Sequence, residues 1–219
     1  MLLHGYLSSK EAFSYQIEYF SRFFRVTAFD FLGFGGSRDL TKPFSVSDYA
    51  DWTREVLALL KVCKPHVIAH SFGCRVAVKM AGRDPSAFDK MVLTGPAGVI
   101  LKRGFVYHTK VNVYRLVRRF APDFAEKKFG SAEYKTLSPV MKESYKKIVN
   151  EDLRGDARRI RNKVLLVEGT EDTTTPISEA KEYLACLENG ALRTLGGGHF
   201  AFLENPVTFN LIAEEFLYV

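Results

Sequence analysis

The sequence predicts an α/β protein built on a doubly wound, mostly parallel sheet. Short apolar runs typical of buried strands alternate along the chain with stretches whose apolar residues recur at helical spacing. Such alternation produces parallel strands joined by helices that cover both faces of the sheet. A second observation is that Ser71, Asp172 and His199 each directly follow a predicted strand. The carboxyl ends of parallel strands meet at one edge of a sheet, so we expect these side chains to converge there.

The composition is that of a globular chain long enough for one sizeable domain. Of its 219 residues, 47% are hydrophobic and 26% are charged, which excludes an intrinsically disordered protein. No run approaches the ~20 apolar residues of a membrane span, and Met1–His4 lacks the basic region of a secretory signal. The cysteines Cys63, Cys74 and Cys186 have no disulfide or metal spacing and predict reduced thiols in a cytoplasmic protein.

The predicted elements follow one another in a regular order. A short apolar piece at Met1–Leu3 ends at His4-Gly5, and Ser45 with Asp48 predicts a capping box for a helix that extends to about Lys61. The other predicted elements are strands at 25–29, 66–69, 90–94, 164–168 and 192–195, and helices at 11–23, 73–82, 178–187 and from Pro206 onward.

One long stretch, residues 99–161, interrupts this order. It is too long for a simple crossover between two strands, and it predicts helices at 107–120, 123–129 and 139–150, with 151–161 returning to the sheet. We therefore expect a core made of residues 1–98 and 162–219, with residues 99–161 inserted as a helical cap over the strand ends.

The charge of the chain is concentrated in this insertion. Sixteen Lys and Arg against seven Asp and Glu between Gly98 and Asn162 give a balance of +9, whereas the whole chain carries +6. A basic segment can bind nucleic acid or anionic lipid, but these charges alternate with apolar residues at helical spacing. We favour a solvated helical surface, and we expect a small-molecule substrate with no nucleic-acid partner and no membrane span.

Ser71 lies in a tight turn, Ala69-His70-Ser71-Phe72-Gly73, between a predicted strand and a predicted helix. A hydroxyl is a poor nucleophile at neutral pH and needs a base beside it. A sharp turn of this kind lifts the serine above the sheet edge, where a base can reach it. It also needs small neighbours, which Gly73 and Ala69 supply.

The sequence resembles the α/β-hydrolase superfamily, in its single-domain esterase and lipase-like branch. The resemblance is carried by His4-Gly5, by Asp30-x-x-Gly33-x-Gly35-x-Ser37, by His70-Ser71-Phe72-Gly73 and by Asp172 with His199, in that order along the chain. Ala69 departs from the glycine that the family often has there. Family members usually carry an antiparallel strand pair before the strand that ends in His-Gly, so the first two strands are expected to be missing.

The resemblance implies a role for each site residue. Ser71 is the nucleophile, His199 is the general base and then the general acid, and Asp172 orients His199 and stabilises its charged form. The backbone N–H groups of Tyr6 and Phe72 form the oxyanion hole. The Asp30–Ser37 loop is structural and cradles no phosphate.

Alternatives exist for two of these assignments. Glu171 could replace Asp172 as the acid, and Asp172 could instead cap the helix that follows it. His4, His66, His70 and His108 compete with His199; His4 and His70 are expected to support loops near the pocket. No cluster of His, Cys or Asp predicts a metal, and we expect no cofactor.

The function expected from the resemblance is a serine hydrolase that cleaves a small carboxylic ester through an acyl-enzyme intermediate, with an amide or a thioester as the alternative substrate. The alternative is a ligand-binding protein of the same fold that turns over slowly or not at all. No substrate-binding residues are predicted.

Overall fold

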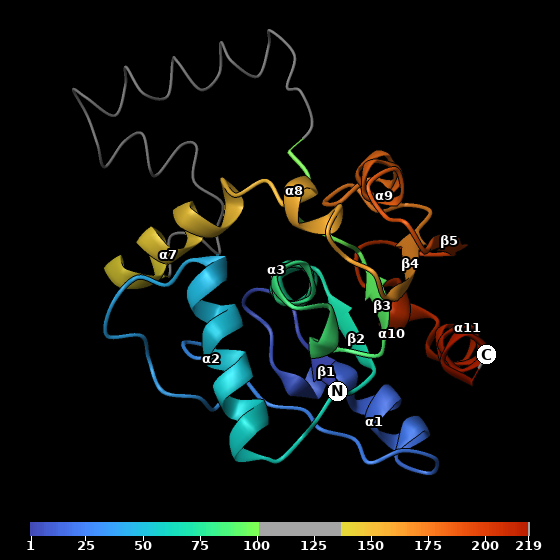
Figure 1. The fold of residues 1–219 in the computed structure, drawn as a ribbon, viewed down its shortest axis with the longest axis horizontal. Helices are drawn as coiled ribbons and strands as arrows, with labels where there is room; N and C mark the ends of the chain where they lie inside the picture. The colour runs from blue at the N-terminus through green and yellow to red at the C-terminus, as the bar shows by residue number, and fades with distance from the viewer. Residues whose placement is uncertain (101–136, 219) are drawn as a thin grey trace, which may run out of the picture.

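A five-stranded parallel sheet forms the centre of the structure, a computed structural model that describes residues 1–100 and 137–218 (Figure 1). Its strands pair in sequence order, which confirms the predicted α/β class. They are β1 (Leu2–Leu3), β2 (Val67–His70), β3 (Lys90–Thr94), β4 (Lys163–Gly169) and β5 (Gly190–Leu195).

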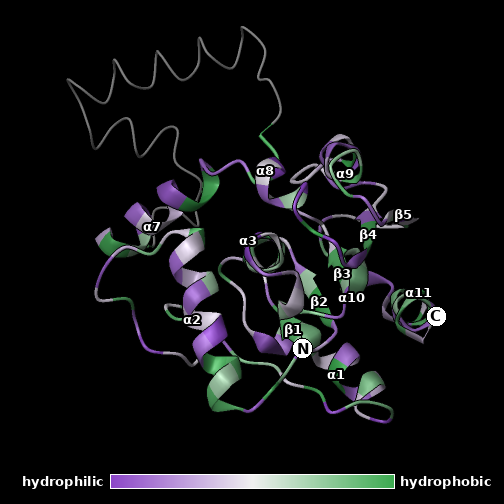
Figure 2. Ribbon diagram, in the orientation of Figure 1, coloured by the Kyte–Doolittle hydropathy of each residue, from purple (hydrophilic) through white to green (hydrophobic). Residues whose placement is uncertain are grey.

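Helices cover both faces of this sheet, because alternate residues of each strand point to opposite sides. Ala69 and Leu93 pack into one hydrophobic cluster with α2 (Val46–Leu59), α3 (Phe72–Arg83) and α9 (Ile177–Leu184). Ile68 and Val92 pack into a second cluster on the opposite face. That cluster includes the 3-10 helix η1 (Lys10–Phe13), α1 (Ser14–Phe20), α10 (Ala201–Glu204) and α11 (Pro206–Tyr218). Figure 2 shows the hydrophobic residues of β2 and β3 at the centre.

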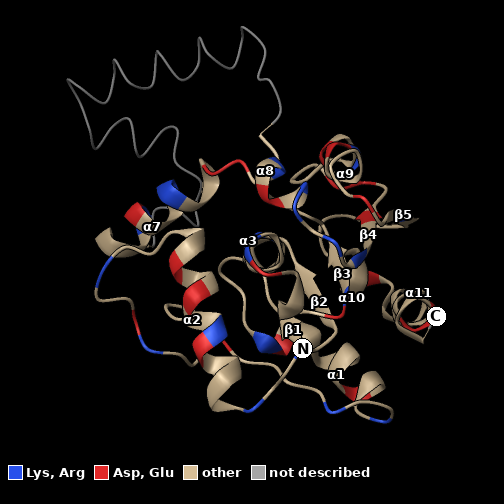
Figure 3. Ribbon diagram, viewed as in Figure 1, with Lys and Arg blue, Asp and Glu red and all other residues tan. Residues whose placement is uncertain are grey.

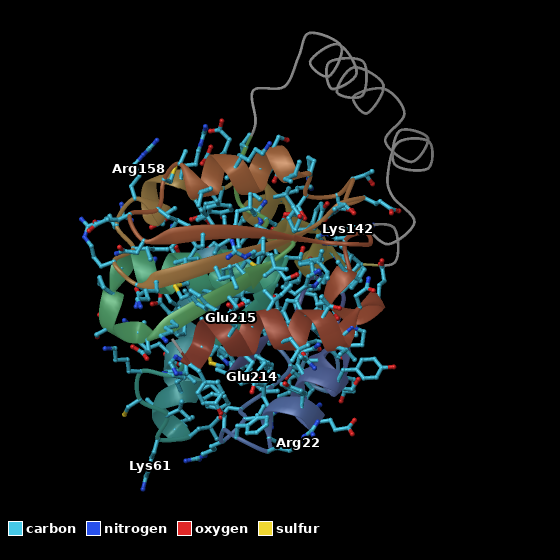
Figure 4. The ribbon with its side chains drawn as sticks, turned by 90° about the vertical axis from the view of Figure 1, so that its right-hand side faces the viewer. Arg22, Lys61, Lys142, Arg158, Glu214 and Glu215 are labelled. Atoms are coloured by element: carbon cyan, nitrogen blue, oxygen red, sulfur yellow. The ribbon has the colours of Figure 1, made fainter. Side chains whose placement is uncertain are left out.

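The helix α11 packs against α1, although their sequences are far apart (Figure 4). Buried Gln16 donates a hydrogen bond to the side chain of Asn210 over 3.0 Å. At the edge of this contact, the Tyr19 hydroxyl donates to Glu214 over 2.6 Å. Among residues 1–100 and 137–218, none of the helices has the length and apolar character to cross a bilayer.

The start of α2 follows the sequence prediction. The Ser45 hydroxyl accepts from the Asp48 N–H at 3.2 Å, and the Asp48 carboxylate accepts from the Ser45 N–H at 2.7 Å. Two donors that the first helical turn leaves unpaired are thereby satisfied. Trp52 packs edge-on against Phe29 with ring centroids 5.6 Å apart, so its role is packing.

The predicted strand at 25–29 is wrong. Only one isolated parallel bridge forms there, between Ala28 and Leu2, with the Leu2 N–H donating to Thr27 over 2.9 Å. The reason is that β1 contains only Leu2–Leu3, which offers a second strand almost nothing to pair with. The predicted helix at 11–23 is divided into η1 and α1, and α10 was not predicted at all.

Two parts of the predicted insertion lie in the described residues. These are α7 (Pro139–Val149), which agrees with the helix predicted at 139–150, and the returning segment, in which the short helix α8 (Arg154–Ala157) was not predicted. The other two predicted helices, 107–120 and 123–129, lie outside the described residues. The helix α7 packs beside the start of α2, where its Ser144 hydroxyl accepts from the Phe44 N–H at 2.8 Å (Figure 1). The division into core and cap stays a prediction.

Candidate active site

Ser71 has an unusual backbone conformation at the junction of β2 and α3, with φ 49° and ψ −107°. A positive φ is strained for a residue other than glycine and is found at sites where the surrounding structure enforces it. Here the Ser71 N–H donates to the Thr94 carbonyl over 3.1 Å. A Cβ at Gly73 would lie 2.2 Å from the Leu3 carbonyl oxygen, so only glycine allows α3 to begin this close to β1.

His199 links Ser71 to Asp172. Its Nε2 lies 3.0 Å from Ser71 Oγ, and its Nδ1 lies 2.7 Å from Asp172 Oδ2. The Nδ1–H donates to the carboxylate, which in the neutral ring leaves Nε2 as the acceptor of the serine proton. Asp172 also accepts from the N–H groups of Thr174 and Thr175, and from the Thr175 hydroxyl at 2.8 Å. Three strand-end segments, after β2, β4 and β5, therefore meet at one point.

The charge state of Asp172 follows from these contacts. Burial alone would raise the pKa of Asp172, but the hydrogen bonds from His199 and Thr175 outweigh it and hold the pKa below its usual range. The carboxylate is therefore ionised at neutral pH. Glu171, the alternative acid, is exposed, and its N–H donates to Gly197 over 2.9 Å. The structure brings Asp172, not Glu171, to His199.

The other described histidines have different surroundings. The buried His70 donates from Nε2 to the His199 carbonyl over 3.0 Å, and burial lowers the pKa of His70 to about 3. The His4 ring accepts from the Phe31 N–H at Nε2, which leaves Nδ1–H to donate to Gly5. Both rings are neutral and support loops, as predicted. His66 lies at the opposite end of β2 beside Asp89, and His108 lies outside the described residues.

Tyr6 and Phe72, the predicted oxyanion-hole residues, line the same cavity as Ser71 and His199. Phe72 is the first residue of α3, and the first N–H groups of a helix have no partner within that helix. The Tyr6 ring lies 5.7 Å from the Phe72 ring, and its hydroxyl donates to the Met141 carbonyl over 3.2 Å. The role of the two N–H groups stays a prediction.

The cavity beside Ser71 has a volume of about 430 Å³. One wall is formed by the end of α7, which contributes Tyr145 and Ile148, and another by Thr174 and Glu179 near the start of α9. Arg75 also lines it, one helical turn after Ser71. Sequence reasoning missed Arg75, and no sequence signal marks it, because an arginine on a helix is usually exposed.

Glu168 is a second residue that sequence reasoning missed. It lies on β4, is fully buried, and neither carboxylate oxygen has a hydrogen-bond partner among the described residues. Burial and the nearby Asp172 raise the pKa of Glu168 to about 9, so its side chain is uncharged at neutral pH. In the described part of the chain, no three His, Cys, Asp or Glu side chains are grouped to hold a metal ion.

The Asp30 loop is held together by its own carboxylate. Asp30 accepts from the Lys10 N–H at 2.7 Å and from the Gly36 N–H at 2.9 Å, and its carboxylate pairs with the Lys10 ammonium. These contacts agree with the structural role predicted for the loop.

The chain is similar in sequence and in structure to known proteins. A 2-hydroxymuconate semialdehyde hydrolase of Pseudomonas putida is 27% identical over 215 residues, which are 88% of this chain and 76% of that protein. An esterase from Exiguobacterium antarcticum superposes with a TM-score of 0.78 at 20% identity, over 100% of this chain and 91% of that one. A meta-cleavage product hydrolase from Pseudomonas fluorescens superposes with a TM-score of 0.75 at 23% identity, over 99% and 89% of the two chains.

Residues 1–140 match the family described as "alpha/beta hydrolase fold". This match includes β1, the turn at Ser71 and β3, while β4 and β5, which precede Asp172 and His199, complete the parallel sheet. The chain, whose relatives include a hydrolase, is therefore a member of the α/β-hydrolase fold family.

Proposed function

We propose that this hydrolase cleaves a small carboxylic ester through an acyl-enzyme intermediate, with Ser71 as nucleophile, His199 as base and Asp172 as orienting acid. The observation that carries the proposal is the continuous hydrogen-bonded chain from Asp172 Oδ2 through His199 to Ser71 Oγ, with steps of 2.7 and 3.0 Å. A serine paired with a base that is itself oriented by a third group is the arrangement required for nucleophilic catalysis.

Acylation follows from this geometry. Ser71 Oγ attacks the ester carbonyl carbon while its proton moves to His199 Nε2, and the carbonyl oxygen becomes an oxyanion. The N–H groups of Tyr6 and Phe72 are proposed to bind that oxygen, and each such donor contributes about 10²–10³ in rate. The ionised Asp172 stabilises the positive charge of the imidazolium that His199 becomes. It then gives its proton to the leaving alcohol as the bond from the carbonyl carbon to the alcohol oxygen breaks.

Deacylation reverses the proton path. A water molecule loses a proton to His199 Nε2 and attacks the acyl carbon, the bond to Ser71 Oγ breaks, and the serine recovers its proton from His199. The products are a carboxylic acid and an enzyme in its starting state. An amide or a thioester would follow the same path with a different leaving group.

A second candidate reaction is hydrolysis of a carbon–carbon bond. It is favoured by the similarity to a protein named 2-hydroxymuconate semialdehyde hydrolase. The same serine and histidine would take part, but a carbon leaving group must accept the proton. Parallel assays on esters and on 2-hydroxymuconate semialdehyde distinguish the two reactions.

We also propose that residues 99–161 form a cap over the site. The contribution of Tyr145, Ile148 and Val149 of α7 to the cavity wall supports this proposal. A cap that carries part of the pocket would determine which acyl groups fit.

The test of the proposed function is a panel of aryl esters with increasing acyl length. We expect Ser71→Ala and His199→Ala to lower kcat/KM by about 10³-fold or more, because each removes a member of the reacting unit. The loss of kcat/KM in Asp172→Asn should be equal to or smaller than that in Ser71→Ala, since Asp172 orients His199 and does not attack the substrate. Glu171→Gln is the matched control because its carboxylate is exposed. Activity within tenfold of the parent in both alanine variants would contradict the assignment.

A fluorophosphonate probe distinguishes the hydrolase from a ligand-binding protein of the same fold. An activated Ser71 forms a covalent adduct that is read as a mass gain on the intact protein, and Ser71→Ala abolishes the gain. A protein that only binds ligands would show no adduct with either sequence.

A further inference from the structure

Arg75 is a cation in the wall of the candidate active site. It lies in the first turn of α3, four residues after Ser71, which is the N-cap residue of that helix. The residue is only 9% exposed, and it lines the cavity that contains Ser71 and His199.

Only part of the guanidinium of Arg75 is used by the protein. Its Nη1 donates to the carbonyls of Ile148 and Glu151, over 2.8 and 3.0 Å, at the end of α7. Within the described residues Nε and Nη2 have no acceptor, yet neither is sealed from solvent. Arg75 borders the cavity, and a molecule bound there could accept from these two donors.

Arg75 also lacks a direct ion-pair partner among the described residues. By contrast, Lys79, one turn further along α3, pairs with both Glu151 and Asp156. Burial lowers the pKa of Arg75, and the carboxylates of Glu179 and Glu151 act in the opposite direction. A guanidinium remains protonated in proteins, and a buried charge without a partner is costly. A ligand that supplies a negative charge would remove this cost.

We propose that Arg75 binds a carboxylate carried by the substrate, so that the enzyme prefers esters whose acyl chain ends in a second carboxyl group. The Nε and Nη2 edge of a guanidinium is planar and matches the two oxygens of a carboxylate. One turn of helix, about 5.4 Å along its axis, separates Arg75 from the N-cap residue Ser71, and both line the same cavity. The acyl chain between the reacting carbonyl and the carboxylate is therefore short, as in a half-ester of succinate. This inference rests on Ser71 being the nucleophile.

Glu179 is the opposing charge in the same cavity. It has contacts of its own, and its carboxylate would repel an anionic acyl chain. Removing that charge should leave the affinity for a carboxylated ester unchanged or raise it. A substrate held instead by Glu179 through a cationic group would show the opposite response.

The catalytic test compares two esters of nearly equal shape, monoethyl succinate and ethyl 4-methylpentanoate, by release of ethanol. We expect the parent enzyme to favour the charged ester at least tenfold in kcat/KM. Arg75→Gln should remove most of this preference through KM, while turnover of the neutral ester stays within about threefold. Arg75→Lys keeps the charge without the planar edge, so its preference for the charged ester should lie between those of the parent enzyme and Arg75→Gln. Arg83→Gln is the matched control, because Arg83 is on α3 but pairs with Asp51 outside the cavity.

A binding measurement keeps the inference testable if neither ester is hydrolysed. Monoethyl succinate is titrated by calorimetry into the Ser71→Ala variant and into the same variant with Arg75→Gln. We expect the affinity of Ser71→Ala for the ester to fall at least tenfold when Arg75→Gln is added. Adding Glu179→Gln to Ser71→Ala instead should not lower that affinity.

Two results overturn the proposal. One is equal binding and equal kcat/KM for the charged and neutral esters in the parent enzyme. The other is an equal loss for both esters in Arg75→Gln, which would make Arg75 only a support for the end of α7. If the charged ester binds through Arg75 but neither ester is hydrolysed, the proposed function fails and the carboxylate site remains.

Discussion

Two neighbouring carboxyl groups near the candidate site are held in opposite charge states. Asp172 receives hydrogen bonds from His199 and Thr175 and is ionised, while Glu168 is buried without a partner among the described residues and holds its proton. Pairs of titratable groups whose environments push their pKa values apart are typical of sites that carry out acid–base chemistry. An ionised Glu168 would add a second negative charge beside Asp172.

Glu168 also predicts how stability depends on pH. The pKa of Glu168 is about 9 in the folded protein against an ordinary value of 4.5, so its favourable contribution is complete below pH 4.5 and is lost as pH rises toward 9. Glu168→Gln has no such proton to lose. We expect its Tm to fall less than that of the parent between about pH 5 and pH 9, measured by thermal unfolding in a series of buffers.

The exposed Glu171 supplies the control for this measurement. Glu171→Gln should leave the slope of Tm against pH as it is in the parent, since that side chain is in solvent. Parallel curves for the parent and Glu168→Gln would mean that Glu168 is ionised in the folded protein.

The contact between the elements α3 and β1 depends on a glycine at position 73, where no side chain separates the two backbones. A Cβ on Gly73 would meet the Leu3 carbonyl oxygen at 2.2 Å, and backbone atoms of two packed elements cannot easily move apart. Gly73→Ala should therefore lower the free energy of unfolding by about 3 kcal/mol or more, measured by urea denaturation.

Gly155 provides the matched substitution. It lies in α8, and a Cβ there would meet nothing within 4 Å. Gly155→Ala should leave stability unchanged or raise it by up to about 1 kcal/mol, because alanine is the better helix former. Equal effects of the two substitutions would show that the approach of α3 to β1 is not tight.

The strands were predictable from the sequence where they are buried on both faces. Lys90–Thr94 is a short apolar run between turn residues, and its predicted bounds match β3. The bridge at Ala28 shows the limit of that signal, because a strand also needs a neighbour long enough to pair with. The sequence pattern of a segment indicates whether the segment is buried. It does not indicate how long the neighbouring strand is when that strand lies far away in the chain.

In the candidate site, too, some residues could be predicted from the sequence and others could not. That Ser71, Asp172 and His199 lie together could be predicted because each follows a strand, and parallel strand ends meet at one edge. Arg75 could not, because an arginine on a helix is usually exposed. Its burial depends on the end of α7, and Ile148 is 73 positions away along the chain.

At the scale of the whole molecule, the basic stretch is attached to the core partly through its own acidic residues. Asp156 and Glu151 pair with Lys79 of α3, whose side chain is 11% exposed, and Arg159 pairs with Asp156 from within the stretch. The helices α3 and α8 are in direct contact, and Figure 3 shows acidic and basic residues together on α8. Although residues 99–161 carry a net charge of +9, their acidic residues Glu151 and Asp156 therefore form ion pairs with the core.

Asp156→Ala tests how much of the attachment depends on this contact. It leaves the buried ammonium of Lys79 with Glu151 alone, and removing one partner of a buried pair typically costs about 3–5 kcal/mol. Because Glu151 remains, we expect the lower end of that range in urea denaturation. Asp51→Ala is the matched control, since Asp51 also pairs with two arginines, Arg54 and Arg83, but its side chain is 48% exposed. Exposed pairs contribute about 0–1 kcal/mol. The difference between the two variants measures the effect of burial, and the absence of a difference would mean that apolar packing of α8 on α3 is sufficient to hold the segment to the core.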